Sequence, residues 1–171
     1  IAANETGVRE VKKMITQFGL DVVQSYMMHV QDNAAESVRR VISALKGGQY
    51  DNELDNGEFI RVVVRVDREN QTAEIDFTGT AEKNPFNYNA PLAVCHAVVL
   101  YVFRALVGAQ IPLNEGCFRP LKIIAPEGSM INAQYPSAVI AGNTEVSQLM
   151  CNALICALGA MAGSQGTMNN Y

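Results

Sequence analysis

The feature that most restricts the fold is an alternation of apolar and charged residues over residues 58–78. In the run 58–67, Ile60, Val62, Val64 and Val66 alternate with polar partners that include Arg61, Arg65 and Asp67, and the run 72–78 repeats the pattern. A period of two is typical of a strand with one buried and one solvated face. The sequence therefore predicts a β-hairpin. Its four-residue turn, which includes Asn70 as a residue that tolerates the left-handed conformation, places Arg65 opposite Glu74.

Helices are predicted on both sides of this hairpin. Apolar residues at helical spacing predict a helix over 2–18 and a longer one from a cap at Asp21 to about Lys46, where Gly47 and Gly48 follow. A third helix, about 90–107, is apolar almost all round, so we expect it to be fully buried, with Asn89 as its cap and His96 as a hydrogen-bonded core histidine. A short strand at 121–125 and a helix from about 143 to 162 complete the prediction, and 47–57 is expected to be a polar loop. The fold class is α+β: long packed helices with a small, largely antiparallel sheet.

One face of the second helix carries polar groups that allow two interpretations. His29, Asp32, Asn33 and Glu36 fall at positions i, i+3, i+4 and i+7, which share one side of a helix. A histidine and two carboxylates could bind a metal or carry protons. The same residues could form a solvated polar face held by contacts between neighbouring turns. Spacing alone leaves both open.

Composition excludes some functions and suggests that the chain is part of something larger. A net charge of −4 and a pI near 5.2 argue against nucleic-acid binding, and the apolar run in 90–107 is too short for a membrane span. Four cysteines without a CxxC pair fit a reducing, cytoplasmic setting rather than a disulfide or zinc site. Residues 84–171 hold only six of the 30 charged side chains. We expect one domain over 1–171, an internal fragment whose second half is covered by other protein.

Neutral polar loops separate the apolar elements at 78–89, 112–117, 142–148 and 164–170. Asn and Gln side chains both donate and accept hydrogen bonds, so such loops suit a small ligand that carries amides, or they satisfy their own buried backbone. Within 142–148, Gly142-Asn143 leads directly into a helix, so Asn143, Glu145, Ser147 and Gln148 lie at a helix start with free backbone N–H groups. The sequence contains no Walker A loop, GxGxxG, GxSxG or HExxH motif.

Several long segments, in one order, resemble the hydantoinase B/oxoprolinase family. They are AANETGVREV near the start, YMMHVQDNAAESVRRVI over 26–42, IDFTGTA over 75–81, NAPLAV over 89–94, VLYVFRALVG over 99–108, the long run 111–148 and SQGTMNN over 164–170. The resemblance extends over essentially the whole chain. Two places depart from the expected pattern: the loop Asn84-Pro85-Phe86-Asn87-Tyr88-Asn89, and Leu149, where the resemblance leads us to expect an arginine.

The resemblance implies ATP-dependent hydrolysis of a small cyclic amide, 5-oxoproline or a hydantoin. Phosphorylation of the ring carbonyl oxygen would create the leaving group that a lactam lacks, and the B-type part would hold the ring and position water. ATP and Mg²⁺ are expected in a hydantoinase A-like subunit or fused region, in a homo-oligomer or hetero-oligomer, and no metal is expected in this segment. The isolated fragment should be inactive. Alternatives are a segment of an acetone carboxylase-like subunit or a non-catalytic scaffold.

The candidate site residues follow from the same loops. His29, Asp32 and Glu145 are candidates for catalysis, and Asn87, Asn89, Asn143, Ser147 and Gln148 are candidates for substrate binding.

Overall fold

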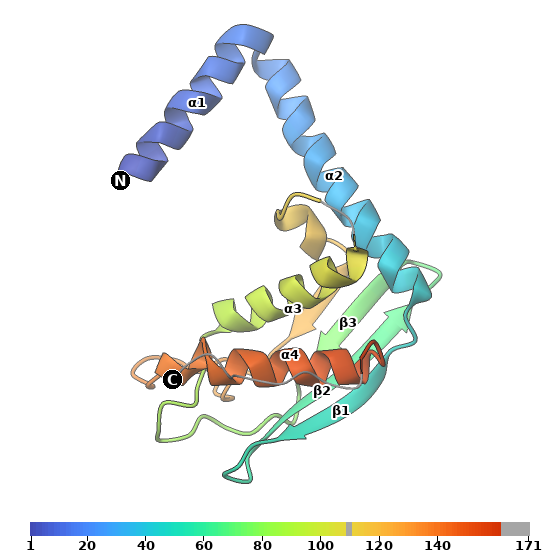
Figure 1. Ribbon diagram of the computed structural model, residues 1–171, viewed down its shortest axis with the longest axis vertical. Helices are drawn as coiled ribbons and strands as arrows, with labels where there is room; N and C mark the ends of the chain where they lie inside the picture. Colours follow the sequence, from blue (N-terminus) through green and yellow to red (C-terminus); the bar gives the residue numbers. More distant parts are fainter. Residues whose placement is uncertain (109–110, 162–171) are drawn as a thin grey trace.

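The structure is a computed structural model that describes residues 1–108 and 111–161. The helices are α1 Ala2–Phe18, α2 Leu20–Ala44, α3 Leu92–Val107 and α4 Glu145–Ala157, with two 3-10 turns, η1 Glu115–Phe118 and η2 Ile140–Gly142. The strands are β1 Gly48–Glu53, β2 Phe59–Asp67, β3 Thr72–Asp76 and β4 Leu121–Ile124. Helices packed on an open sheet confirm the α+β class (Figure 1).

The predicted hairpin forms the centre of the sheet. The strands lie in the order β1-β2-β3-β4, with antiparallel pairs at β1–β2 and β2–β3 and a parallel pair at β3–β4. Arg65 pairs with Glu74, as the alternation predicts, and Asp67 pairs with Thr72 to leave a four-residue turn. The left-handed residue of that turn is Gln71, with φ of 53°, and not Asn70. Asn70 instead donates its backbone and side-chain N–H groups to the Asp67 carboxylate.

Two helices cover one face of the sheet, and a third packs on those helices. α4 lies against β1 and β2, α2 lies against β2 and β3, and α3 contacts both α2 and α4. Ile60, Val62, Ile75 and Phe77 are fully buried beneath these helices. The opposite face carries the charged residues of the alternation, so the sheet has the one wet face that its sequence indicates.

Strand β1 occupies part of the segment 47–57, which was wrongly predicted to be a loop. Its inward positions, set by the pairing with Val64, Val62 and Ile60, are Gly48, Tyr50 and Asn52. These are not the β-branched residues typical of a buried strand, because the α4 backbone lies directly on β1. A Cβ at Gly48 would collide with the Ala157 carbonyl oxygen, and Asn52 Nδ2 donates to the Leu149 carbonyl at 3.3 Å. The apolar alternation is therefore missing.

Helix α3 is not fully buried, and His96 is not a core residue. One side of α3 is buried, including Cys95, Val99 and Phe103, but His96 and the 64% exposed Tyr101 lie on its exposed side. The His96 ring lies 5.9 Å from the Phe118 ring, tilted by 48°. The continuous apolar pattern led to the wrong prediction, because it does not distinguish a helix buried by its own domain from one with an apolar face left open.

Some helix ends also differ from the prediction. Gly19, with φ of 87°, precedes α2, so Asp21 lies inside the first turn and does not cap it. α2 ends at Ala44 and α4 ends at Ala157, both earlier than expected. Pro91 and not Asn89 precedes α3. The amide-rich segment 164–170 lies outside the described residues. None of the described helices is both long enough and apolar enough to span a membrane.

Candidate functional site

The loop before α3 and the segment before α4 lie against each other, and Asn89 joins them. The Asn89 side chain is fully buried. Its Nδ2 donates to the carbonyl oxygens of Asn84 at 3.0 Å, Phe86 at 2.9 Å and Ala138 at 3.0 Å, and its Oδ1 accepts from the Asn84 N–H at 2.9 Å. One side chain therefore closes the loop 84–89 on itself and ties it to the segment that leads into α4.

Backbone contacts extend this junction. The Ala141 N–H donates to the Asn87 carbonyl at 3.1 Å, and the Ala133 N–H donates to the Ala90 carbonyl at 3.0 Å. Gly142 permits the close approach, because a Cβ there would collide with the Asn89 carbonyl oxygen and lie 2.8 Å from the Ala90 Cα. The start of α4 is thus tightly packed against the loop 84–89, which fixes their relative position.

The first turn of α4 presents the polar residues that the sequence predicts. Glu145 is its first residue and is half-buried, while Asn143 and Gln148 are exposed. The Ser147 hydroxyl donates to the Asn143 carbonyl at 3.1 Å, a bond from one turn to the previous one. The side chains of Asn143 and Gln148 are therefore open to solvent, whereas the Ser147 hydroxyl is used inside the helix.

A cavity of about 230 Å³ opens beside Glu145. The turn between β1 and β2 forms one wall, and Tyr88 from the loop 84–89 and two α4 residues form the rest. The lining residues are Glu53, Leu54, Asp55, Asn56, Tyr88, Glu145 and Leu149. Among them none is basic and three are acidic, and Leu149 supplies an apolar wall at the position where the resemblance leads us to expect an arginine. The lining therefore supplies an apolar wall for a small ring and no positively charged partner for an anionic group.

The structure brings most predicted site residues to this junction but leaves two apart. Asn87 and Asn89 lie in the loop, and Asn143, Glu145, Ser147 and Gln148 lie at the start of α4. His29 and Asp32 lie on α2, which runs from the top of Figure 1 down to the sheet, and neither residue lines the cavity beside Glu145. Tyr88 and the turn residues Glu53, Asp55 and Asn56 were not predicted from the sequence. The signal for the turn residues is the three acidic side chains within 47–57, and the signal for Tyr88 is its place in the loop that departs from the family pattern.

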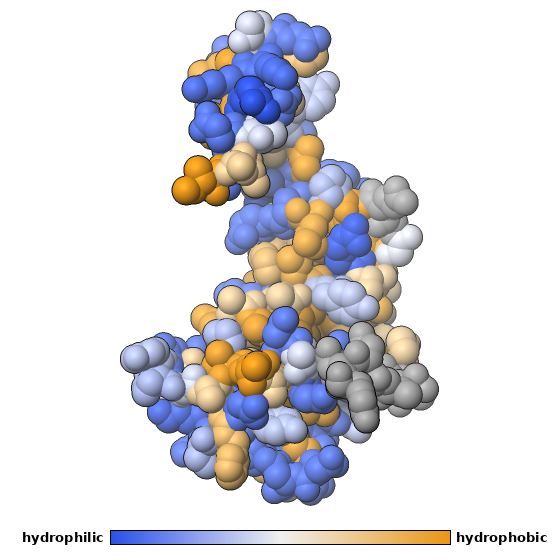
Figure 2. All heavy atoms as spheres, turned by 60° about the vertical axis from the view of Figure 1, so that its left-hand side comes forward, coloured by the Kyte–Doolittle hydropathy of each residue, from blue (hydrophilic) through white to orange (hydrophobic). Residues whose placement is uncertain are grey.

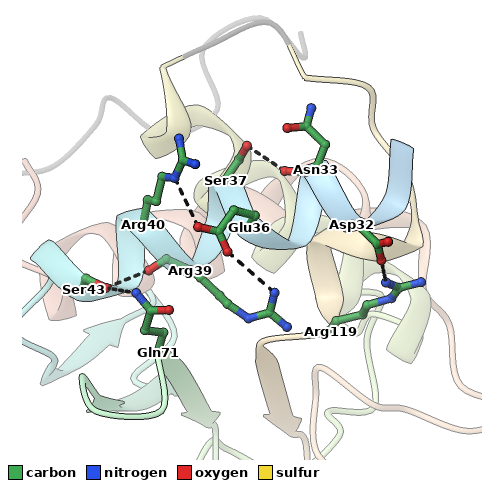
Figure 3. A network of polar contacts seen from close by, with 9 residues as sticks. All are labelled: Asp32, Asn33, Glu36, Ser37, Arg39, Arg40, Ser43, Gln71 and Arg119. Carbon is green, nitrogen blue, oxygen red and sulfur yellow. Dashed lines mark hydrogen bonds and ion pairs between the residues drawn. The ribbon is translucent and has the colours of Figure 1, made fainter. Parts of the chain in front are cut away.

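The polar face of α2 is a network of contacts within the protein (Figure 3). Asp32 Oδ1 lies 2.5 Å from Arg119 Nη1, and Glu36 accepts from Arg40 at 3.3 Å. The exposed His29 ring packs edge-on against Tyr26, with the ring centroids 6.1 Å apart. Across the described ranges, no three His, Cys, Asp or Glu side chains are grouped to hold a metal ion. This geometry favours the second interpretation of the pattern, a structural polar face.

Cys95 and Cys151 contribute no activated thiol to this region. Both are buried and free. Burial raises the pKa of Cys95 to about 12 and also raises the pKa of Cys151. A nucleophilic cysteine requires the opposite shift, so these side chains act as small apolar core residues.

Comparison with known proteins identifies the family. The family model for hydantoinase B/oxoprolinase matches residues 1–171. The chain belongs to the hydantoinase B/oxoprolinase family. This hydantoinase B segment is 37% identical to 5-oxoprolinase 1 of Arabidopsis thaliana, over 99% of the chain but only 15% of the plant protein. It is 30% identical to the B component of a putative D-/L-hydantoinase from a Pseudomonas species, over 88% of the chain and 29% of that component.

Solved structures share the fold of the hydantoinase B segment. The crystal structure of an ATP-dependent caprolactamase from Pseudomonas jessenii aligns with a TM-score of 0.74 at 21% identity, over 92% of this chain and 28% of that one. A nucleotide-free acetone carboxylase structure aligns with a TM-score of 0.72 at 13% identity, over 89% of this chain and 22% of that one. At such identities the likeness shows a shared fold and does not separate the two chemistries.

Proposed function

We propose that this chain is a segment of an ATP-dependent hydrolase of cyclic amides, and that the cavity beside Glu145 holds the substrate ring. The relatives named as a 5-oxoprolinase and as a hydantoinase component support the substrate class. The observation that carries the assignment of the site is the convergence of Glu145 and Tyr88 on one small cavity, fixed by the buried Asn89. In this proposal 1–171 is one domain within a longer polypeptide.

The chemistry requires activation of the ring from outside this segment. A lactam carbonyl is a poor electrophile, and ATP supplies the phosphoryl group that turns its oxygen into a leaving group. In line with the family resemblance, we propose that ATP and Mg²⁺ bind in a hydantoinase A-like subunit or fused region, within an oligomer that completes the active site.

The residues of this segment would bind the ring, exclude water and move one proton. The Glu145 carboxylate is positioned to accept a proton from a water molecule that attacks the ring carbon. Tyr88 and Leu149 would cover the ring and keep out bulk water. Asn143 and Gln148 lie at the same helix start but outside the cavity lining, and we keep their exposed amides as candidates for binding a part of the substrate that extends beyond the cavity. Asn89 would support the site without contacting the ring, because its side-chain polar atoms are already bonded within the loop 84–89 and to the segment before α4.

The direct test is ATP hydrolysis by the full-length protein with its A-type partner, measured with and without 5-oxoproline, hydantoin or acetone. We expect a cyclic amide to stimulate ADP release and to be opened in proportion. Stimulation by acetone alone, with uptake of bicarbonate, would favour the acetone carboxylase-like alternative. If none of the three compounds stimulated ATP hydrolysis in a protein that assembles normally, the result would favour the non-catalytic scaffold alternative.

A further inference from the structure

Helices α1 and α2 form an arm that extends away from the rest of the molecule (Figure 1). The two helices meet at Gly19 and diverge from there. None of the 17 described residues of α1 is buried, although α1 has an apolar side. Among the described elements the main contact of α1 is with α2, and a helix of this length that buries no residue is marginal in water. The described residues therefore leave the arm without a buried contact for α1.

The inner side of the arm is an apolar groove of about 690 Å³, which we call the arm groove. Six of its apolar side chains are between 40% and 67% exposed: Met14, Phe18, Val22, Tyr26, Met27 and Val30. Gln31 and Asn114 form its polar edge, and none of its described lining residues is charged. Figure 2 shows apolar surface between the polar residues of the arm. A groove of this size and character is a contact surface and not ordinary solvent-facing surface.

The lengths of the relatives indicate what fills the arm groove. This chain matches 15% of the plant 5-oxoprolinase, and it matches only 29% of the Pseudomonas hydantoinase component. Even in that component, more than two thirds of the same polypeptide lies outside the matched segment. A segment of the same chain is held near the groove at high effective concentration, whereas a second copy or another subunit must be recruited. An uncharged groove also selects an apolar occupant, such as the apolar face of a helix.

We propose that the arm groove receives an apolar segment of the same polypeptide from outside residues 1–171. The contact orders α1 and anchors the arm to the remainder of the protein. This proposal rests on the exposed groove and on the lengths of the relatives, and not on the proposed reaction. Its test therefore gives the same answer whether or not a cyclic amide is the substrate.

Two adjacent methionines provide a matched test in the full-length protein. Met27 lines the groove and is 45% exposed, and Met28 does not line it and is 58% exposed. From this segment alone, peroxide should oxidise both at similar rates. If the groove is filled, we expect Met27 to be oxidised about tenfold more slowly than Met28. Tandem mass spectrometry of the peptide that contains both residues assigns the added oxygen to one methionine or the other. Equal rates, whether both fast or both slow, would overturn the proposal.

Photo-crosslinking from position 27 identifies the occupant. With p-benzoylphenylalanine in place of Met27, we expect a crosslinked product of monomer mass on a denaturing gel. In that product, the peptide that carries position 27 should be joined to a peptide of the same chain from outside residues 1–171. A product of dimer mass would assign the groove to a second copy. A product with an A-type subunit would assign it to that partner. Either of these products, or the lack of any product, would contradict a same-chain occupant.

Discussion

At the scale of single residues, the site depends on Asn89 and Gly142. The sequence places Asn89 among the substrate-binding candidates, and this role stays a prediction. The structure shows that its amide is buried and bonded within the protein. Gly142 could be predicted only as part of a helix start, because sequence does not reveal that its Cα approaches the Asn89–Ala90 backbone. Residue type thus predicted that this loop is a candidate region. The contacts in the structure show that the Asn89 side chain holds the loop in place.

Replacing Asn89 by Ala should destabilise the protein. The change leaves the carbonyl groups of Asn84, Phe86 and Ala138 without their side-chain donor in a buried place, at a cost of roughly 3 kcal/mol. Asn87→Ala is the matched control, because Asn87 is exposed and only its backbone carbonyl is used. Thermal unfolding of the two full-length variants measures the difference. An equal melting temperature for both would contradict the role assigned to Asn89.

Replacing Gly142 by Ala should also destabilise, by about 1–3 kcal/mol, because the added methyl group forces the two loops apart. Gly7→Ala is the control with the opposite expected sign. Gly7 lies inside α1, and an added methyl carbon there would meet nothing within 4 Å, so alanine should favour the helix by about 0.5–1 kcal/mol. Thermal unfolding again provides the measurement. A Gly142→Ala protein as stable as the parent would show that the loops can separate without cost.

At the scale of the elements, charged side chains on the wet face connect three strands of the sheet. Arg65 bonds to Glu74 at 2.7 Å and to Asp76 at 3.0 Å, and Lys122 bonds to Glu74 at 2.7 Å. The hydrogen bond from Lys122, followed by that from Arg65, holds the pKa of Glu74 below its ordinary value of 4.5. Hydrogen bonds from Thr78, followed by that from Arg65, lower the pKa of Asp76. The network therefore favours the charged forms of both carboxyl groups.

The lowered pKa values predict a loss of stability in acid. A carboxyl group with a depressed folded pKa contributes its full stabilisation above its unfolded pKa, and this contribution disappears as the pH falls through the folded value. The melting temperature should change little down to about pH 5 and fall below it. Arg65→Met should make this fall shallower, by a small amount because the pair is exposed.

Arg40→Met is the control, since it removes an ion pair on α2 that lies outside the sheet. If Arg65→Met and Arg40→Met gave the same acid profile as the unaltered protein, the sheet network would have no role in the pH dependence.

The predictability of each element follows from how its side chains are used. The hairpin, α2 and α4 were predicted because their apolar faces are buried within the segment itself, and α1 was predicted from apolar spacing although none of its residues is buried. β1 was missed because the α4 backbone packs directly on its inward face at Gly48, where no side chain fits. The burial of α3 was predicted wrongly because Tyr101 and its neighbours form an apolar face that the described residues leave open. Sequence pattern reports which faces are apolar, and not what covers them.

At the scale of the whole molecule, the same limit applies to the site. The segment 142–148 was recognised as a candidate because it is polar and resembles the family, and the loop 84–89 because it is polar. Their convergence on a cavity with Glu53 and Asp55 could not be predicted, because those residues come from a hairpin turn far away in the sequence. The expectation that other protein covers the weakly charged second half stays a prediction. The 75% exposed Ile140 and 70% exposed Phe86 are consistent with it.

The most direct test of the proposed site is the ring-opening rate of full-length Glu145→Gln, measured with its partner and a saturating cyclic amide. Glutamine keeps the shape of the side chain but cannot accept the proton, so kcat should fall about 100-fold with an unchanged melting temperature and unchanged assembly. Glu127→Gln, which alters an exposed glutamate in a turn outside the cavity, should keep full activity. A normal kcat for Glu145→Gln would contradict the assignment of the site to the start of α4.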